Sequence, residues 1–257
     1  MKKRLVYHIV AQPYWEVATE FTINKMKTDG LWDKFDDIHL CCHYEPEKFS
    51  TFVETMSQDN RITCHVFSDS VRRRGETWTN NKLKEICDKD TEEWAVLRLH
   101  NKSSNYYDPN NVPPGSSYTP PNGDYHIDRE FPFVWRDLVY YWNIERWELM
   151  VNKLEEVEIA ANEWLPQFFA HAGGNIFWVR SSYIKRLVYM PLPKHFDDHT
   201  GFFIAWEHPR HEVESWSGSG NPTHWAAYPS LSSWAFQEWS QQNWIDRKPF
   251  NDREIGQ

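Results

Sequence analysis

Cysteine is scarce in this sequence and is confined to the first third of the chain. The four cysteines are Cys41, Cys42, Cys64 and Cys87, and none is spaced as a Cys-x-x-Cys pair. That spacing is typical of structural zinc sites and redox-active disulfides. The pattern therefore argues against both, and we expect buried thiols in a reducing compartment, consistent with a cytoplasmic protein.

Long apolar runs are also missing. No stretch approaches the roughly 18 uninterrupted apolar residues that a membrane span needs. The apolar start of the chain is broken by Gln12 and Pro13 before a signal-peptide core could form. We therefore expect a soluble, unprocessed protein with no membrane span.

Positive charge is too sparse for a nucleic-acid partner. The net charge is −9, and residues 72–74 form the one run of arginines. Binding to phosphate backbones needs a basic face, so we expect no nucleic acid partner.

Several well-known catalytic motifs do not occur. The sequence contains no Walker loop, no G-x-G-x-x-G, no H-E-x-x-H and no G-x-S-x-G, which argues against P-loop kinases, Rossmann dehydrogenases, zincins and typical α/β-hydrolases. The twelve histidines fit no metal-ligand spacing, and His195 and His199 form their one local cluster. We expect a structural role for most of them.

Aromatic residues, in contrast, are abundant. They make up 16% of the chain and include 15 tryptophans. They could fill a tryptophan-rich core, but exposed aromatic faces also stack on sugar rings, so carbohydrate is a candidate ligand.

Apolar periodicity predicts an α/β fold with a mostly parallel central sheet flanked by helices. Strands are expected at residues 5–10, 36–44, 61–68 and 92–100, and helices at residues 14–28, 80–87 and 135–154. A proline-rich loop is expected at residues 102–132. In such folds the ligand lies at the carboxyl ends of the strands, which points to Ala11, Gln12 and Asp69 as nucleoside contacts.

Two segments carry the candidate site. The fourth strand ends in His100, Asn101, Lys102 and Ser103, which can orient a ligand or pair with phosphate, although an ordinary polar strand end fits equally. Residues 168–187 read as a polar turn, a short strand and a helix capped by serines; the turn holds Gly173, Gly174 and Asn175. A corner without chemistry is the alternative there.

Carboxylates are the candidate bases. Glu207, Glu212 and Glu214 flank a turn that follows a loop containing Asp197 and Asp198. A carboxylate partly buried against tryptophan rings gains basicity, although acidic loop residues are usually just solvated. Residues 88–90 spell Asp-Lys-Asp but precede the strand, so we expect a solvated helix end there.

Four segments together resemble one family. "WAVLRLHNKSS" resembles the "Y-V-L-x-L-H-T-K-x-S" strand end of rhamnan-synthesis-type glycosyltransferases, and "HAGGNIFWVRSSYIKRL" resembles their "F-S-G-N-F-W-W-A-R-S-x-Y-I-x-x-L". "RDLVYYWNIERWELMVNKL" is similar to their long helix, and "EVESWSGSGNP" to their "E-x-W-I-G-S-G-x-P". The likeness spans residues 7–222 in order and extends to the small glycosyltransferases of chloroviruses, which include a β-xylosyltransferase.

The resemblance implies a GT-A type, Rossmann-like fold in one domain. Residues 1–104 would form a nucleotide-sugar half and residues 105–257 an acceptor half. The implied activity transfers a sugar, xylose as the first expectation, from a UDP-sugar to an oligosaccharide or glycoprotein acceptor, with inversion, in viral capsid N-glycan synthesis in the host cytoplasm. A catalytically silent carbohydrate-binding protein is the alternative.

The resemblance also implies roles for individual residues. Glu214 would be the catalytic base, with Asp198 as second choice, and Trp178 and Trp216 would join the Gly-Gly-Asn turn in binding sugar. Many GT-A enzymes hold Mn²⁺ or Mg²⁺ with an Asp-x-Asp after the fourth strand. Here residues 100–102 read His-Asn-Lys, so either other groups bind the metal or Lys102 replaces it.

Overall fold

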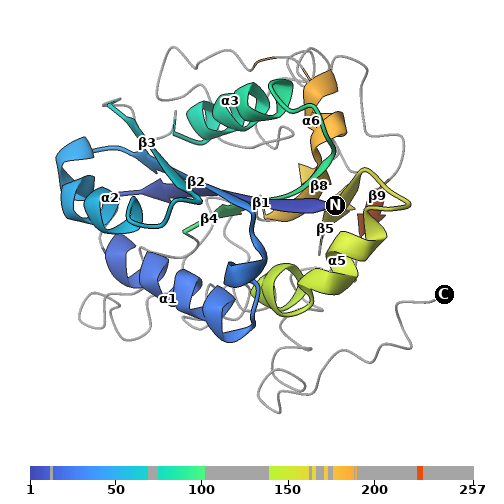
Figure 1. Cartoon of the computed structure of the whole chain (residues 1–257), viewed down its shortest axis with the longest axis horizontal. Coiled ribbons are helices and arrows are strands. Elements are labelled where there is room, and N and C mark those ends of the chain that lie inside the picture. The colour runs from blue at the N-terminus through green and yellow to red at the C-terminus, as the bar shows by residue number, and fades with distance from the viewer. Residues whose placement is uncertain are drawn as a thin grey trace, which may run out of the picture.

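A mixed, mostly parallel sheet lies at the centre of the fold (Figure 1). The structure is a computed structural model, and it describes residues 1–11, 14–68, 75–101, 139–161, 164–165, 171–172, 176–187, 189 and 225–227. Within them, the main sheet has the strand order β3-β2-β1-β4-β8-β5-β9. Its strands are β1 (Lys2–Val10), β2 (Asp37–His43), β3 (Ile62–Phe67), β4 (Trp94–His100), β5 (Ile159–Ala161), β8 (Phe177–Arg180) and β9 (Trp225–Ala227).

The first four strands confirm the predicted parallel arrangement. β1 pairs in parallel with β2 and with β4, and β2 pairs in parallel with β3. β8 then runs antiparallel between β4 and β5. A separate antiparallel pair joins β6 (Trp164–Leu165) to β7 (His171–Ala172).

Helices cover both faces of the sheet. On one face pack α1 (Trp15–Thr28), α2 (Ser50–Met56) and α5 (Trp147–Lys153), with the short turns η1 (Trp32–Lys34), η2 (Pro46–Phe49) and η5 (Tyr141–Glu145). On the other lie α3 (Gly75–Asp88) and α6 (Ser181–Arg186), as Figure 1 shows. The apolar run of β1 follows from this arrangement, because Leu5 packs under α1 while its neighbour Val6 packs under α3.

The predicted helix at residues 135–154 is interrupted. Residues 141–145 form a π-helical turn in which the Arg146 N–H donates to the Tyr141 carbonyl oxygen at 2.9 Å, and α5 begins after it. Trp142, Asn143 and Ile144 are all fully buried. A regular α-helix turns about 100° per residue and does not bury three successive side chains against one sheet, so the wider turn follows from this packing demand.

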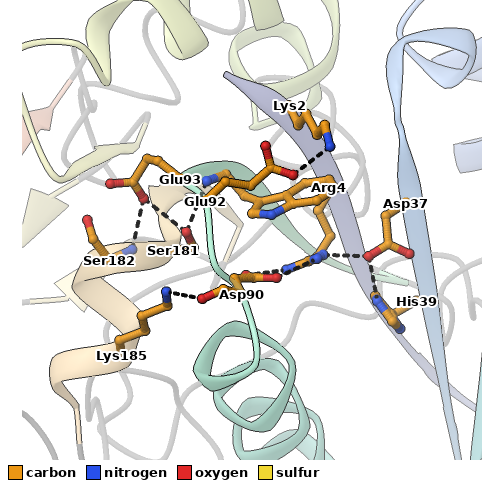
Figure 2. Close-up of polar contacts among 11 residues, drawn as sticks. Lys2, Arg4, Asp37, His39, Asp90, Glu92, Glu93, Ser181, Ser182 and Lys185 are labelled. Carbon is orange, nitrogen blue, oxygen red and sulfur yellow. Dashed lines mark hydrogen bonds and ion pairs between the residues drawn. The ribbon is translucent and has the colours of Figure 1, made fainter.

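The predicted serine cap of α6 is wrong in detail. The residue at the cap position is Arg180, and no side chain there caps the helix. Instead, the Glu93 carboxylate accepts hydrogen bonds from the Ser182 N–H and the Ser181 hydroxyl, both at 2.9 Å (Figure 2). A carboxylate distant in sequence therefore ties α6 to the start of β4.

Asp90 is not the solvated residue that the sequence predicted. Its carboxylate accepts two hydrogen bonds from the Arg4 guanidinium, at 2.7 and 3.0 Å, and its side chain is 8% exposed. Arg4 also donates to Asp37 at 2.7 Å, and its guanidinium lies 4.1 Å from the centre of the Trp94 ring. As Figure 2 shows, Arg4 joins β1, β2 and the α3–β4 connection.

The prediction of buried thiols is confirmed for three cysteines. Cys41, Cys42 and Cys87 are buried, Cys64 is half-buried, and all four are free. Burial raises the pKa of the Cys41 thiol to about 12, so this thiol is neutral at physiological pH.

Candidate functional site

The candidate site lies where the strand order changes direction. From β1 the chain adds β2 and β3 on one side, and then crosses to place β4 on the other side of β1. The loops leaving two such strands diverge and open a crevice at their carboxyl ends, where open α/β sheets bind ligands. The carboxyl ends of β1 and β4 therefore define the candidate site.

Asn101 joins these two strand ends. Its backbone N–H donates to the His8 carbonyl oxygen at 3.1 Å. Its side-chain amide donates to the Val10 carbonyl oxygen at 3.1 Å and accepts from the Val10 N–H at 3.3 Å. Asn101 is 5% exposed, so its amide ties the carboxyl ends of β1 and β4 together rather than offering the ligand contact that the sequence suggested.

Positively charged and imidazole groups surround His8 on the α3 side of this edge. His8, His43 and Arg98 are buried and His100 is half-buried. Burial lowers the pKa of His8 well below its ordinary value, and the nearby Arg98, His43 and His100 lower it further. His8 is therefore neutral at physiological pH, while the region carries the positive charge of Arg98.

A buried hydroxyl orients the His8 ring. His8 Nδ1 lies 2.8 Å from Oγ1 of Thr79 on α3, and both residues are buried. This hydrogen bond fixes α3 against the carboxyl half of β1. The polar groups of the edge are thus held by the sheet and by a 14-residue helix, which keeps them pre-organised.

The chain leaves β1 and β2 through unusual backbone conformations. Tyr14, Tyr44 and Glu45 have φ angles of 61°, 68° and 51°, and they are the non-glycine residues with positive φ in the described part of the chain. Each such conformation costs about 1–2 kcal/mol for a residue with a side chain. All three follow the carboxyl end of a strand, so backbone strain is concentrated beside the candidate site.

Sequence reasoning did not identify Tyr14, Tyr44 or Glu45 as site residues. Glycine or asparagine usually marks a left-handed position, and neither occurs at these three positions. The sequence therefore carries no signal from which this strain could have been found.

The predicted nucleoside contact Ala11 lies at this edge. It is 3% exposed, and its N–H donates to the His43 carbonyl oxygen at 3.1 Å, which extends the β1–β2 pairing by one step. His100 ends β4 and pairs in register with His8. The structure thus brings Ala11, His100 and Asn101 together at the ends of neighbouring strands.

Trp178 does not agree with its predicted role. Its side chain is fully buried in β8, its ring stacks on Phe35 at 6.1 Å, and its indole N–H donates to the Asn143 carbonyl oxygen at 3.0 Å. A ring that packs in the core has no face to offer a sugar, so we correct this assignment to a core residue.

The other predicted site residues lie outside the described residues. They are Gln12, Asp69, Lys102, Ser103, Gly173, Gly174, Asn175, Asp198, Glu214 and Trp216. Among the residues that are described, no group of three or more His, Cys, Asp or Glu side chains is arranged to hold a metal ion.

Comparisons with known proteins place the chain in no family. No family model, curated protein or solved structure matched it. The fold is a mixed α/β fold with a mostly parallel sheet flanked by helices. Within the described ranges, no helix is both long enough and apolar enough to cross a membrane.

Proposed function

We propose that this protein is a glycosyltransferase with a GT-A type fold that uses a UDP-sugar as donor. The acceptor is a hydroxyl of a growing glycan, the transfer inverts the anomeric carbon, and xylose is the first donor sugar to test. Synthesis of a viral capsid N-glycan is the biological setting that the sequence resemblance suggests.

The observation that carries this proposal is the change of strand order at β1, which sets the carboxyl ends of β1 and β4 side by side. Open α/β sheets bind nucleotides at such a change of strand order. Asn101 ties the two strand ends together, and Arg98 near the end of β4 supplies buried positive charge close to His8. A nucleoside diphosphate carries negative charge that such an environment favours.

The sequence supports the same site independently. The segment that resembles the family's strand end includes His100, Asn101 and Lys102, and the first two stand at this edge of the sheet. The place that resembles the family's nucleotide-sugar strand end is therefore also the place where this sheet topology favours a ligand.

The test is release of UDP from a panel of UDP-sugars, followed by transfer to glycan acceptors. We expect one donor, UDP-xylose first, to be hydrolysed slowly alone and faster with an acceptor. A heat-unfolded sample of the same preparation controls for contaminating hydrolases. If no donor is turned over and no nucleotide binds, the transferase proposal is wrong; glycan binding under those conditions would favour a catalytically silent carbohydrate-binding protein.

A further inference from the structure

The strand β3 lies at the edge of the sheet and carries none of the usual edge protection. Among the described strands it has one neighbour, β2, and Figure 1 shows it as the outermost strand on that side. Its residues, Ile62–Phe67, include no lysine, arginine or carboxylate and no proline or glycine, and their register with β2 is unbroken. Edge strands are usually blunted by charge, proline or a bulge, because their open backbone groups pair with other strands. A further strand can therefore join β3.

The backbone of β3 points alternately toward β2 and away from it. The Ile38 N–H of β2 donates to the Arg61 carbonyl oxygen at 2.9 Å, so the odd-numbered residues of β3 bond to β2. The even-numbered residues Cys64 and Val66 direct both their N–H and their C=O groups outward. No hydrogen bond within the described part of the chain reaches these four groups. Val66 is 44% exposed, so this edge is open to solvent.

The inner side of β3 is held in place. His65 Nε2 lies 2.9 Å from His39 Nδ1 on β2. Arg61, just before the strand, donates to the carbonyl oxygens of Trp32 and Phe35 at 3.2 and 3.1 Å. The open edge therefore belongs to a fixed strand, and pairing with another strand does not have to order it first.

We propose that β3 is a dimer interface, at which it pairs antiparallel with β3 of a second copy of this chain. A second copy presents the same open edge, and a two-fold axis makes the contact closed rather than filament-forming. The strand carries no carboxylate, lysine or arginine that would repel its copy. The flanking helix α3 carries Lys82 and Glu85 near His65, one charge of each sign, so it does not repel its copy either. This interface does not depend on the proposed function.

Hydrogen bonding selects one register for the pair. A two-fold axis at His65 places Cys64 opposite the partner's Val66, and all four outward groups of these two residues then form hydrogen bonds. An axis at Cys64 would need the Ile62 N–H as a donor, but this group already donates to the Asp59 carbonyl oxygen at 2.9 Å. We therefore expect His65 to face its own copy across the axis.

The first test is sedimentation velocity of the full chain over a range of concentrations. We expect a monomer–dimer equilibrium, because paired six-residue strands give an interface at the small end of the known range. Val66→Pro removes two hydrogen bonds across the axis and should weaken the dimer ~10–100-fold. The monomer tolerates proline there, because the Val66 N–H points away from β2. Val66→Thr keeps the N–H and is the matched control, which should dimerise as the wild type does.

Disulfide trapping tests the register. Residues that face each other across the axis have Cα atoms ~4.5 Å apart, which is within the range of a disulfide. His65→Cys, made together with Cys64→Ser, should therefore form a covalent dimer on mild oxidation. In the wild type, Cys64 should not crosslink to its copy, since an offset of two residues puts the two Cα atoms roughly 8 Å apart.

The outcomes separate the interface from its register. A wild type that stays monomeric up to the highest soluble concentration, or a Val66→Pro variant that dimerises as tightly as the wild type, would overturn the β3 interface. A covalent dimer formed through the native Cys64, or none formed through His65→Cys, would overturn the axis at His65. If circular dichroism shows that Val66→Pro does not fold, the trapping result decides the interface as well.

Discussion

Replacing Arg4 by Met should unfold the protein at a markedly lower temperature. The Arg4 side chain is 5% exposed and donates to Asp37 and Asp90, so its removal leaves two carboxylates that have lost their cation. Breaking a buried ion pair from one side costs about 3–5 kcal/mol. Asp37 is 26% exposed and retains its hydrogen bond from His39 at 3.0 Å, so we expect the lower end, about 3 kcal/mol.

The assay is urea and thermal unfolding at neutral pH. For a chain of this size, a loss of about 3 kcal/mol lowers Tm by about 6–12 °C. Lys2→Met is the matched control on the same strand, because Lys2 is ion-paired with Glu92 but both side chains are about half exposed. Solvent screens such a pair, so Lys2→Met should unfold close to the wild type.

A triple variant separates the ion pairs from packing. Arg4→Met combined with Asp37→Asn and Asp90→Asn removes every uncompensated charge and should recover most of the lost stability. The reasoning is wrong if Arg4→Met and Lys2→Met unfold at the same temperature, or if the triple variant is less stable than Arg4→Met.

Three further predictions concern pH and the proposed chemistry. Burial first, and then repulsion from His39 and Lys82, lower the pKa of His65 from 6.5 to about 4. The unfolded chain therefore binds a proton that the folded chain does not, so the free energy of unfolding should fall as the pH drops from 6.5 to 4, by less than the full pKa difference implies because solvent screens the partly exposed ring. Urea titrations should find this slope reduced in His65→Asn. If Lys102 replaces a metal, Lys102→Ala should weaken UDP binding ~10–100-fold in calorimetry, and the activity of the wild type should survive EDTA. Lys89→Ala, at a lysine whose side chain is 72% exposed, is the control and should bind UDP normally. Activity that is lost in EDTA and restored by Mn²⁺ would contradict the hypothesis that Lys102 replaces the metal. Glu214→Gln should keep UDP-sugar binding and lose ~10²-fold in transfer rate, with Glu148→Gln as the control, and normal turnover would move the base to Asp198.

β2 and β4 could be predicted because they are buried on both faces, and β3 because it is rich in β-branched residues although its side chains are partly exposed. Residues 36–44, 61–68 and 92–100 were predicted as strands and contain β2, β3 and β4. The start of β1 was missed: it begins at Lys2, where backbone pairing with Trp94 continues although the lysines are solvated. A pattern based on apolar residues does not detect a strand end that only backbone hydrogen bonds define.

The start of α3 was missed for a different reason. The prediction began at residue 80, but the helix begins at Gly75 and buries Thr77 and Thr79. A search for apolar periodicity does not count threonines, so it does not detect these two buried positions. Thr79 is buried with a polar partner, because its hydroxyl lies 2.8 Å from Nδ1 of His8 on the sheet beneath α3.

The candidate site could be located from sequence but not resolved into roles. The polar end of the fourth strand was predicted, and Asn101 stands there, but its amide serves the backbone of Val10. Which partner an amide finds depends on the neighbouring strand, and no local pattern contains that information. The left-handed backbone of Tyr44 and Glu45 likewise carries no glycine or asparagine from which it could have been predicted.

The position of β1 in the middle of the sheet has a consequence for synthesis on the ribosome. β1 is made before both of its partners, which are β2, ending at His43, and β4, ending at His100. At ~5–20 residues per second, the edge of β1 that awaits β4 stays unpaired for roughly 3–11 s after β2 has been made. Through that interval the nascent chain presents the unpaired edge of an apolar strand. Chaperones therefore have most to protect at this stage, before residue 100 has been made.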